Sequence, residues 1–238
     1  GCGLSETRDG GYGEYARLEG KWPSPLPPGL SLRESMILGT AGFTAALGLL
    51  RMQENRQHPA LGPIAVTGAS GGVGSLAVAI FARAGYEVVA ISGKPEHADY
   101  LRQLGARDIL GRDAILTVKP MDSTRFGGAL DNVGGPMLAS LLAQVAPYGN
   151  VPSCGLAGSP VLDATVMPFI IRGVSLLGIA SAGTARDLRD AVWSRLASDW
   201  KPTGLDAIAT REIALGQLPE VFPLMLAGNS FGRTIVKM

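Results

Sequence analysis

The sequence has few of the residues that build disulfide frameworks, metal centres and nucleic-acid surfaces. Its 238 residues include two cysteines and two histidines, and the formal net charge is +1. Cys2 and Cys154 cannot form a disulfide framework, and no Cys-x-x-Cys pair is present. His58 and His97 are expected on the surface. With so few cysteines and histidines, we predict no metal site. Because no run of Lys and Arg occurs, we also predict no nucleic-acid partner.

Long hydrophobic runs are also scarce. The apolar stretch 161–171 is interrupted by Asp163, Thr165 and Pro168 and falls short of a membrane span. No secretory signal is recognisable, and the low cysteine content suits a reducing compartment. We therefore expect a cytoplasmic protein without a membrane segment. The sequence begins at Gly1 without a methionine, and we expect it to be part of a longer protein.

By contrast, one glycine-rich stretch is informative. The β-branched run 64–67 leads into glycines, and apolar residues of helical period follow over 76–84. Gly71 and Gly74 have the spacing of the last two glycines of a dinucleotide fingerprint, with Ala69 at the first position. The helix would offer free N–H groups and a partial positive charge to a pyrophosphate. A glycine turn without a ligand is the alternative.

Strands alternate with helices along most of the chain. This alternation predicts right-handed βαβ units, and therefore an α/β fold with a Rossmann-type, doubly wound parallel sheet. Ser31 and Glu34 have the spacing of a capping box at a helix start. Strands are expected at 11–18, 64–67, 87–92, 108–110, 127–133, 149–155, 174–179, 208–213 and 232–237. Helices are expected from 31, and at 41–52, 76–84, 97–104, 136–145, 184–200 and 218–227.

The end of the second core strand distinguishes NAD from NADP. An acidic residue there would accept from the ribose hydroxyls and repel a 2′-phosphate. The sequence instead has Ser92, Gly93 and Lys94, and Arg112 follows the next strand. A hydroxyl, a flexible backbone and cations suit a phosphate, so we predict a preference for NADPH. Solvated surface charges are the alternative interpretation of Lys94 and Arg112.

A short-chain dehydrogenase would share the glycine turn but needs a Tyr-x-x-x-Lys pair for proton transfer. None of the tyrosines has a lysine four residues later. That class is therefore excluded.

Several motifs together resemble the medium-chain dehydrogenase/reductase superfamily. They are Thr40–Ala45, Val66–Gly74, Gly85–Val89, Leu104–Ala106 and Asp131–Gly135. A closer resemblance is to its zinc-free quinone oxidoreductase branch, and within it to the acryloyl-CoA reductase subgroup. The segments that carry this closer resemblance are Ile91–Lys94, Gly111–Asp113, Cys154–Gly158, Thr165–Ile170 and Gly232–Lys237.

The resemblance implies an enzyme that reduces an activated carbon–carbon double bond with NADPH. Hydride would go to the β-carbon of acryloyl-CoA or a related enoyl thioester, giving propanoyl-CoA from the former. A quinone reductase, or an NADPH-binding relative without activity, are the alternatives.

The resemblance implies that Ser70, Gly71, Gly72 and Val73 hold the pyrophosphate, and that Ser92, Gly93, Lys94 and Arg112 hold the adenosine end. It places Thr44, Leu156, Ile170, Ser181 and Asn229 near the nicotinamide. Core packing is an equal alternative for Leu156 and Ile170, and no catalytic residue is predicted.

The resemblance also implies a domain organisation and an assembly. Residues 1–30 would be the end of an N-terminal, β-rich substrate domain of the GroES-like type, most of which is missing from this sequence. Residues 31–204 would form the NADP-binding domain, and residues 205–238 would return to the substrate domain. The expected strand 174–179 is apolar and would be the last of the sheet. Because an apolar edge strand favours pairing, we expect a homodimer.

Overall fold

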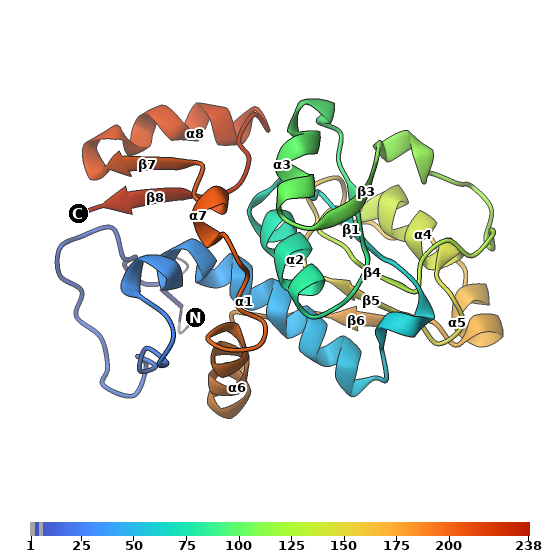
Figure 1. Cartoon of the computed structure of the whole chain (residues 1–238), viewed down its shortest axis with the longest axis horizontal. Coiled ribbons are helices and arrows are strands. Elements are labelled where there is room, and N and C mark those ends of the chain that lie inside the picture. The colour runs from blue at the N-terminus through green and yellow to red at the C-terminus, as the bar shows by residue number, and fades with distance from the viewer. Residues whose placement is uncertain (1–2, 5–6) are drawn as a thin grey trace.

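The computed structural model describes residues 3–4 and 7–238, and its centre is a twisted parallel sheet (Figure 1). The strands β1 (Ile64–Thr67), β2 (Val88–Ile91), β3 (Ala106–Leu110) and β4 (Gly128–Leu130) pair in the order β3-β2-β1-β4. A further parallel pair is formed by β5 (Asn150–Ser153) and β6 (Ser175–Gly178). A bridge between Asp131 and Ser153 joins β5 to β4. The resulting order 3-2-1-4-5-6 is that of a doubly wound sheet, as the sequence predicts.

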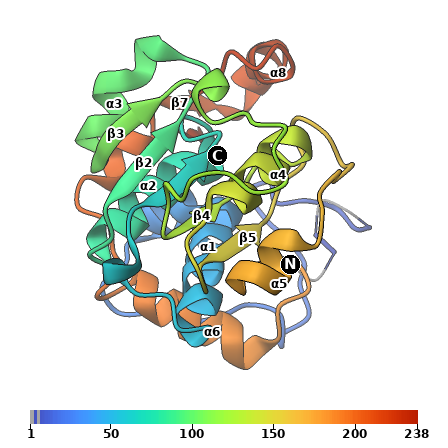
Figure 2. The same ribbon diagram turned by 90° about the vertical axis from the view of Figure 1, so that its right-hand side faces the viewer.

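Helices cover both faces of this sheet, and each face has its own core. On β1, Ile64 and Val66 belong to the cluster with α1 and α2, whereas Ala65 between them belongs to the cluster with α4. Every residue of β1 and β2 is buried, which explains their continuous apolar sequence. Figure 2 shows the strands in succession from β3 to β5. The helices are α1 (Leu32–Glu54), α2 (Gly72–Arg83), α3 (Ala98–Gln103), α4 (Gly135–Gln144), α5 (Met167–Arg172), α6 (Arg186–Leu196), α7 (Leu205–Ile208) and α8 (Leu218–Leu226).

Helix α1 joins two helices that the sequence predicts separately. Its interior is broken at Gly39, where φ is 49° and ψ is −154°. By length and composition α1 could cross a membrane, but 67% of its apolar window is buried inside the protein. Its hydrophobicity is therefore that of a core helix. The predicted capping box is present: the Ser31 hydroxyl accepts from the Glu34 N–H, and the Glu34 carboxylate accepts from the Ser31 N–H.

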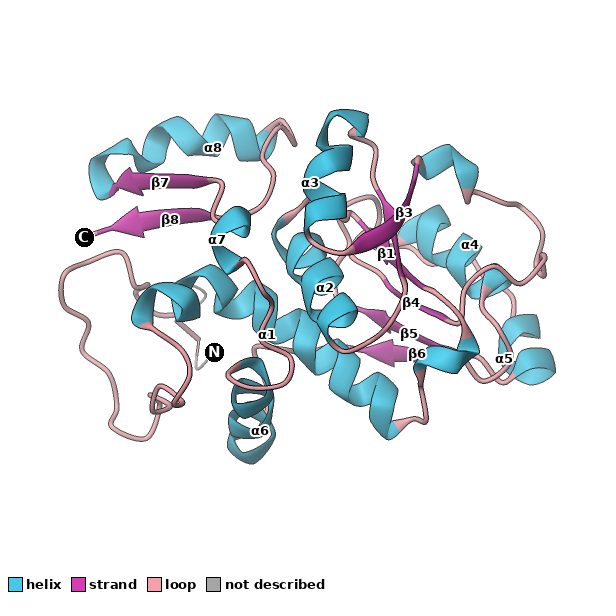
Figure 3. Cartoon of the chain, viewed as in Figure 1, coloured by secondary structure: helices cyan, strands magenta, loops and turns pink. Residues whose placement is uncertain are grey.

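The C-terminal residues form a small separate layer beside the main sheet (Figure 3). Here β7 (Arg211–Ala214) pairs in parallel with β8 (Thr234–Lys237), and α8 lies against them. Two strand predictions are corrected. Ile208 is the last residue of helix α7 and is fully buried in the core, so the strand begins later, at Arg211. Residues 11–18 are exposed and form no strand, because no strand among the described residues lies beside them to pair with.

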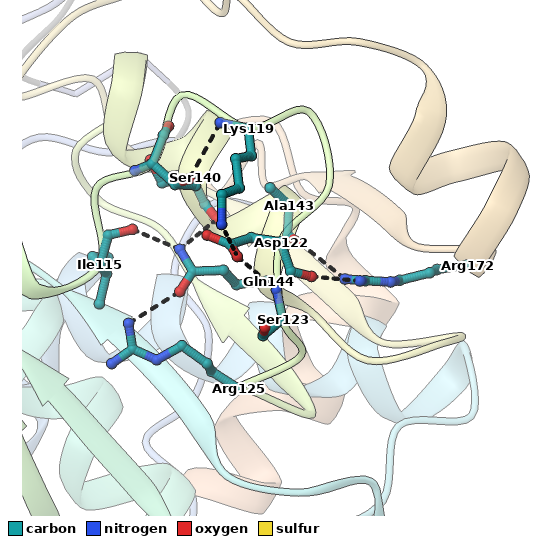
Figure 4. A network of polar contacts seen from close by, with 10 residues as sticks. Ile115, Lys119, Asp122, Ser123, Arg125, Ser140, Ala143, Gln144 and Arg172 are labelled. Carbon is teal, nitrogen blue, oxygen red and sulfur yellow. Dashed lines mark hydrogen bonds and ion pairs between the residues drawn. The ribbon is translucent and has the colours of Figure 1, made fainter.

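A polar network fastens the long connection between β3 and β4 to the end of α4 (Figure 4). The buried Gln144 side chain donates to the Ile115 carbonyl at 2.5 Å and accepts from Arg125 Nη1 at 3.1 Å. Arg172 at the end of α5 donates to the Asp122 carbonyl at 2.5 Å. These bonds satisfy buried backbone groups and hold the connection, α4 and α5 together.

The charge of Glu34 gives a testable stability effect. Hydrogen bonds from Lys201, whose Nζ lies 2.6 Å away, and from Ser31 lower the pKa of Glu34 from 4.5 to about 2. Both side chains keep nearly a third of their exposure, so solvent screens the pair. Glu34→Gln keeps a capping group but loses the ion pair, and should cost about 0.5 to 1 kcal/mol at pH 7.

The lowered pKa also fixes the direction of the pH dependence. The carboxylate stabilises the fold above pH 4.5, and this stabilisation is lost as the pH falls toward about 2. Urea unfolding at pH 7 and at about pH 3 measures this effect. The difference in the free energy of unfolding between wild type and variant should be smaller at about pH 3 than at pH 7. A difference that stays constant would contradict the assignment.

Candidate cofactor site

The glycine turn after β1 has the geometry of a phosphate-binding loop. Gly68 has a φ of +58°, and its carbonyl accepts from the Gly71 N–H at 2.9 Å. Helix α2 then begins at Gly72, and no side chain caps its first N–H groups. A Cβ on Gly74 would overlap the Gly68 carbonyl oxygen, so the last glycine of the motif is required for the helix to pack on the turn. The turn therefore presents an uncapped helix N-terminus at the carboxyl edge of the sheet.

The Arg233 guanidinium lies over this helix N-terminus. A Cβ on Gly72 would be 3.3 Å from its Nη1, and a Cβ on Gly39 would be 3.1 Å from its Nη2. Its Nε donates to the Ile37 carbonyl at 3.3 Å, and within residues 3–4 and 7–238 the side chain forms no ion pair. Burial lowers the pKa of Arg233. A partly desolvated cation therefore faces the positive end of a helix, an arrangement that an anion would stabilise.

Sequence reasoning assigned no role to Arg233. The residue belongs to the C-terminal segment, which is far from the glycine turn in sequence. The fold connects them: the Gly232 N–H donates to the Ser70 carbonyl at 2.9 Å, and the Arg233 N–H donates to the Ile208 carbonyl at 2.7 Å. The available signal was that Arg233 lies in Gly232–Lys237, one of the segments that carry the family resemblance, and Gly39 leaves room for its guanidinium.

The residues predicted for the adenosine end lie together beyond β2. The buried hydroxyls of Ser70 and Ser92 are 3.4 Å apart, and Ser92 Oγ accepts from the Lys94 N–H at 3.1 Å. The Arg112 guanidinium packs on Gly93, where a Cβ would be 2.7 Å from its Nε. Residues 91–94 contain no carboxylate. The two cations and two hydroxyls that the sequence assigns to the adenosine end therefore lie around residues 92–94.

A buried polar cluster fixes the strand ends at the centre of the site. The Asp131 carboxylate is fully buried and accepts from Thr67 Oγ1 and from the Gly134 N–H, each at 2.8 Å. Burial raises the pKa of Asp131. Asn132 donates to the Thr67 carbonyl at 2.7 Å. This cluster holds the ends of β1 and β4 together at the point where the strand order reverses, which is where ligands of open α/β sheets bind.

Cys154 follows β5 beside this cluster. Its thiol lies 3.2 Å from Asn132 Oδ1, and burial raises the thiol pKa to about 12. It is therefore a packing and hydrogen-bonding group, not a nucleophile. Cys2 lies outside the described residues.

The residues predicted to line the nicotinamide are more dispersed. Thr44 is buried on α1, and its hydroxyl donates to the Thr40 carbonyl at 2.7 Å. Leu156 and Ile170 are 66% and 74% exposed, so neither is a core residue. The Ser181 carbonyl accepts from Arg189 at 3.0 Å, and the Asn229 N–H donates to the Leu224 carbonyl at 2.8 Å. In the part of the chain described, these five side chains form no hydrogen bond with one another.

The sheet order, the glycine turn and the cation over α2 define a dinucleotide-binding domain of the Rossmann type. The sequence profile of the family described as zinc-binding dehydrogenase matches residues 72–198. "Putative quinone oxidoreductase YhfP" of Bacillus subtilis is 47% identical over 99% of this chain and 72% of its own length. Acrylyl-CoA reductase AcuI of Ruegeria pomeroyi is 45% identical over 99% of this chain and 72% of its own length.

Solved structures agree with these similarities. B. subtilis YhfP with NAD bound superposes with a TM-score of 0.97, over 99% of this chain and 72% of that chain. The YhdH oxidoreductase of Salmonella enterica in complex with NADP is 44% identical and has a TM-score of 0.96, over 100% of this chain and 73% of that chain. The chain therefore belongs to the medium-chain dehydrogenase/reductase superfamily, in its zinc-free quinone oxidoreductase and acryloyl-CoA reductase branch.

The residues described contain no cluster of three or more His, Cys, Asp or Glu side chains that could hold a metal ion. His58 and His97 are on separate turns, and His97 stacks on Phe231 at 4.1 Å between ring centroids.

Proposed function

We propose that this protein is an NADPH-dependent reductase of the activated carbon–carbon double bond of a small enoyl thioester, such as acryloyl-CoA. The observation that carries the proposal is the Arg233 guanidinium, which faces the uncapped N-terminus of α2 without an acidic partner in the described chain. A dinucleotide pyrophosphate supplies the missing negative charge, and both groups bind phosphate oxygens well.

The adenosine end supports NADPH over NADH. Two similar solved structures hold different cofactors, NAD in YhfP and NADP in the S. enterica enzyme. In this chain Lys94 and Arg112 flank Gly93, and Ser92 adds a buried hydroxyl. We propose that these side chains bind the 2′-phosphate, while Ser70, Gly71, Gly72 and Val73 cradle the pyrophosphate together with Arg233. Thr44, Leu156, Ile170, Ser181 and Asn229 are proposed to lie along the nicotinamide.

The reaction needs a hydride, a proton and a polarised carbonyl. The reduced nicotinamide supplies the hydride to the β-carbon of the thioester, and a proton from solvent or an acid goes to the α-carbon. The products are the saturated thioester and the oxidised cofactor. Within the described chain the residues above bind and orient the cofactor. We assign no residue of this chain to proton donation or to carbonyl polarisation.

A quinone is the second candidate acceptor. The similarity to a relative named as a quinone oxidoreductase, at 47% identity, favours it as much as the similarity to AcuI favours a thioester. An NADPH-binding protein without turnover is the third possibility. The low cysteine content supports a reducing compartment, and we include a cytoplasmic location in the proposal.

The three possibilities are separated by one assay. The protein is mixed with NADPH, and nicotinamide absorbance is followed after addition of acryloyl-CoA, crotonoyl-CoA or a soluble quinone. We expect oxidation that requires acryloyl-CoA, with propanoyl-CoA as product. Oxidation that requires only the quinone would support the second function, and tight NADPH binding without oxidation by any acceptor would support the third.

If Arg233 binds the pyrophosphate, replacing it should weaken NADPH binding without lowering the stability of the cofactor-free protein. Arg233→Met removes an unpaired, partly desolvated cation, so the protein without cofactor should be no less stable than wild type. NADPH at about 100 times its Kd should stabilise wild type by about 2.7 kcal/mol. We expect the Kd of the variant to be about 10- to 100-fold higher. The same NADPH concentration would then stabilise the variant by only about 1.4 to 0.4 kcal/mol.

Thermal unfolding with and without NADPH measures both quantities. Arg211→Met, at an exposed arginine on β7, is the matched control and should keep the full cofactor effect. Equal stabilisation of the Arg233 variant and wild type by NADPH would refute the pyrophosphate assignment.

We propose further that two copies pair through β6. In the described chain β6 has one strand neighbour, β5, and the side chain of Leu176 on it is 36% exposed. Its free edge offers backbone groups for a second strand.

We also propose that residues 1–30 and 205–238 belong to a substrate domain and residues 31–204 to the cofactor domain.

Pairing through β6 predicts a mass change in one variant. Light scattering should give the mass of two chains for wild type and of one chain for Leu176→Lys, because a charge on the edge opposes strand pairing. Leu226→Lys, at an 88% exposed leucine on α8, should leave the mass unchanged. A single-chain mass for wild type would overturn the proposal.

A further inference from the structure

The segment Asn229–Gly232 crosses from α8 to β8 beside the proposed 2′-phosphate site. Its position is fixed at one end by the hydrogen bond from the Gly232 N–H to the Ser70 carbonyl, at 2.9 Å. Gly232 has a φ of +59°, and a Cβ there would be 2.6 Å from the Ile208 carbonyl oxygen. The chain therefore fits closely between the glycine turn and α7 at this point.

The middle of the segment is held by aromatic contacts. The Phe231 ring stacks on His97 at 4.1 Å and meets Tyr100 edge-on at 5.3 Å. His97 and Tyr100 come from the turn and helix α3 that follow Lys94 directly. The Tyr100 hydroxyl is buried and makes no hydrogen bond within the described residues. Stacking and edge-on aromatic contacts therefore join Phe231 to His97 and Tyr100.

Lys94 is bound to the same segment. Its Nζ donates to the Ser230 carbonyl at 2.8 Å. This acceptor is neutral, and the ion pairs of the described residues do not include Lys94. An ammonium has three donors, and the carbonyl uses one. The carbonyl therefore orients the ammonium without neutralising it, which leaves the charge available to a phosphate.

We propose that Phe231 is a specificity-determining positioning residue. By packing on His97 and Tyr100 it holds the Ser230 carbonyl against Lys94, and so keeps the ammonium where the 2′-phosphate of NADPH binds. A lysine has a long flexible side chain, and fixing it before the ligand arrives reduces the entropy lost on binding. This inference rests on the proposed function, because it requires NADPH to bind beside Lys94.

The test compares two cofactors that differ only in the 2′-phosphate. Nicotinamide fluorescence titration gives the Kd of NADPH and of NADH for wild type and Phe231→Ala. We expect the Kd of NADPH to rise about threefold to tenfold, the cost of ordering one long side chain. The Kd of NADH should change by less than about twofold, since NADH has no group for Lys94. A similar rise for both cofactors would overturn the inference.

Matched variants separate positioning from general damage. Phe231→Tyr keeps the stacking ring and should retain the wild-type Kd for NADPH. Phe222→Ala removes a phenylalanine on α8 that is 48% exposed, and should also have no effect. His97→Ala removes the opposite face of the stack and should reproduce the selective loss, which provides the test if Phe231→Ala does not fold. Loss of NADPH affinity in Phe222→Ala would count against a specific role for Phe231.

A double-mutant cycle tests whether Phe231 acts through Lys94. In a Lys94→Met background, Phe231→Ala should change the Kd of NADPH by less than about 1.5-fold, because the group that it positions is gone. A full threefold to tenfold effect in that background would overturn the proposal. Wild-type protein that binds no NADPH would refute the proposed function itself. Wild-type protein that prefers NADPH, with an unaffected Phe231 variant, would refute only the present inference.

Discussion

The close approach of α2 to the glycine turn is the constraint on which the site depends. The first turn of α2 packs so tightly on Gly68 that a Cβ on Gly74 cannot be accommodated. That approach places the uncapped N–H groups at the carboxyl edge of the sheet. It also makes the Ser70 carbonyl available to the C-terminal segment, which brings Arg233 over the helix N-terminus. A looser turn would separate all of these groups, even if every strand of the sheet still formed.

The site is positively charged, and within the described residues its cations have no carboxylate partners. Within the described residues, Arg233, Lys94 and Arg112 lie against carbonyl oxygens or glycine backbone, and none of the three forms an ion pair with a carboxylate. The one fully buried acid nearby, Asp131, is already committed to Thr67 and to backbone N–H groups. The partly desolvated Arg233 beside a helix N-terminus lowers the stability of the cofactor-free protein, and the phosphates of a bound dinucleotide would offset that cost. The arrangement is therefore better explained by a ligand than by the needs of the fold.

Local sequence patterns predicted the features that depend on neighbouring residues. The capping box of Ser31 and Glu34, the glycine turn and the alternation of strands and helices all follow from short-range chemistry, and the structure contains them. Features that depend on contacts between residues far apart in the sequence were missed or were predicted wrongly. The strand expected at 11–18 has the right alternation but no neighbour, and Ile208 is drawn into a helix by burial in the core. Arg233 and Phe231 gain their importance from contacts with residues more than a hundred positions away, and no spacing rule can indicate such contacts.

The relatives show why cofactor choice has to be argued from side chains. YhfP with NAD and the S. enterica enzyme with NADP superpose on this chain almost equally well, with TM-scores of 0.97 and 0.96. A backbone that fits both cannot decide between the two cofactors. The two cofactors differ by one phosphate, and the groups that we propose to bind it are Ser92, Lys94 and Arg112. Lys94 has a long and flexible side chain, so its contribution depends on what holds it in place. In this chain that support comes from the segment between α8 and β8, outside the sheet and its βαβ units. Our proposal therefore implies that cofactor preference depends on residues of the C-terminal segment as well as on the glycine turn and the sheet.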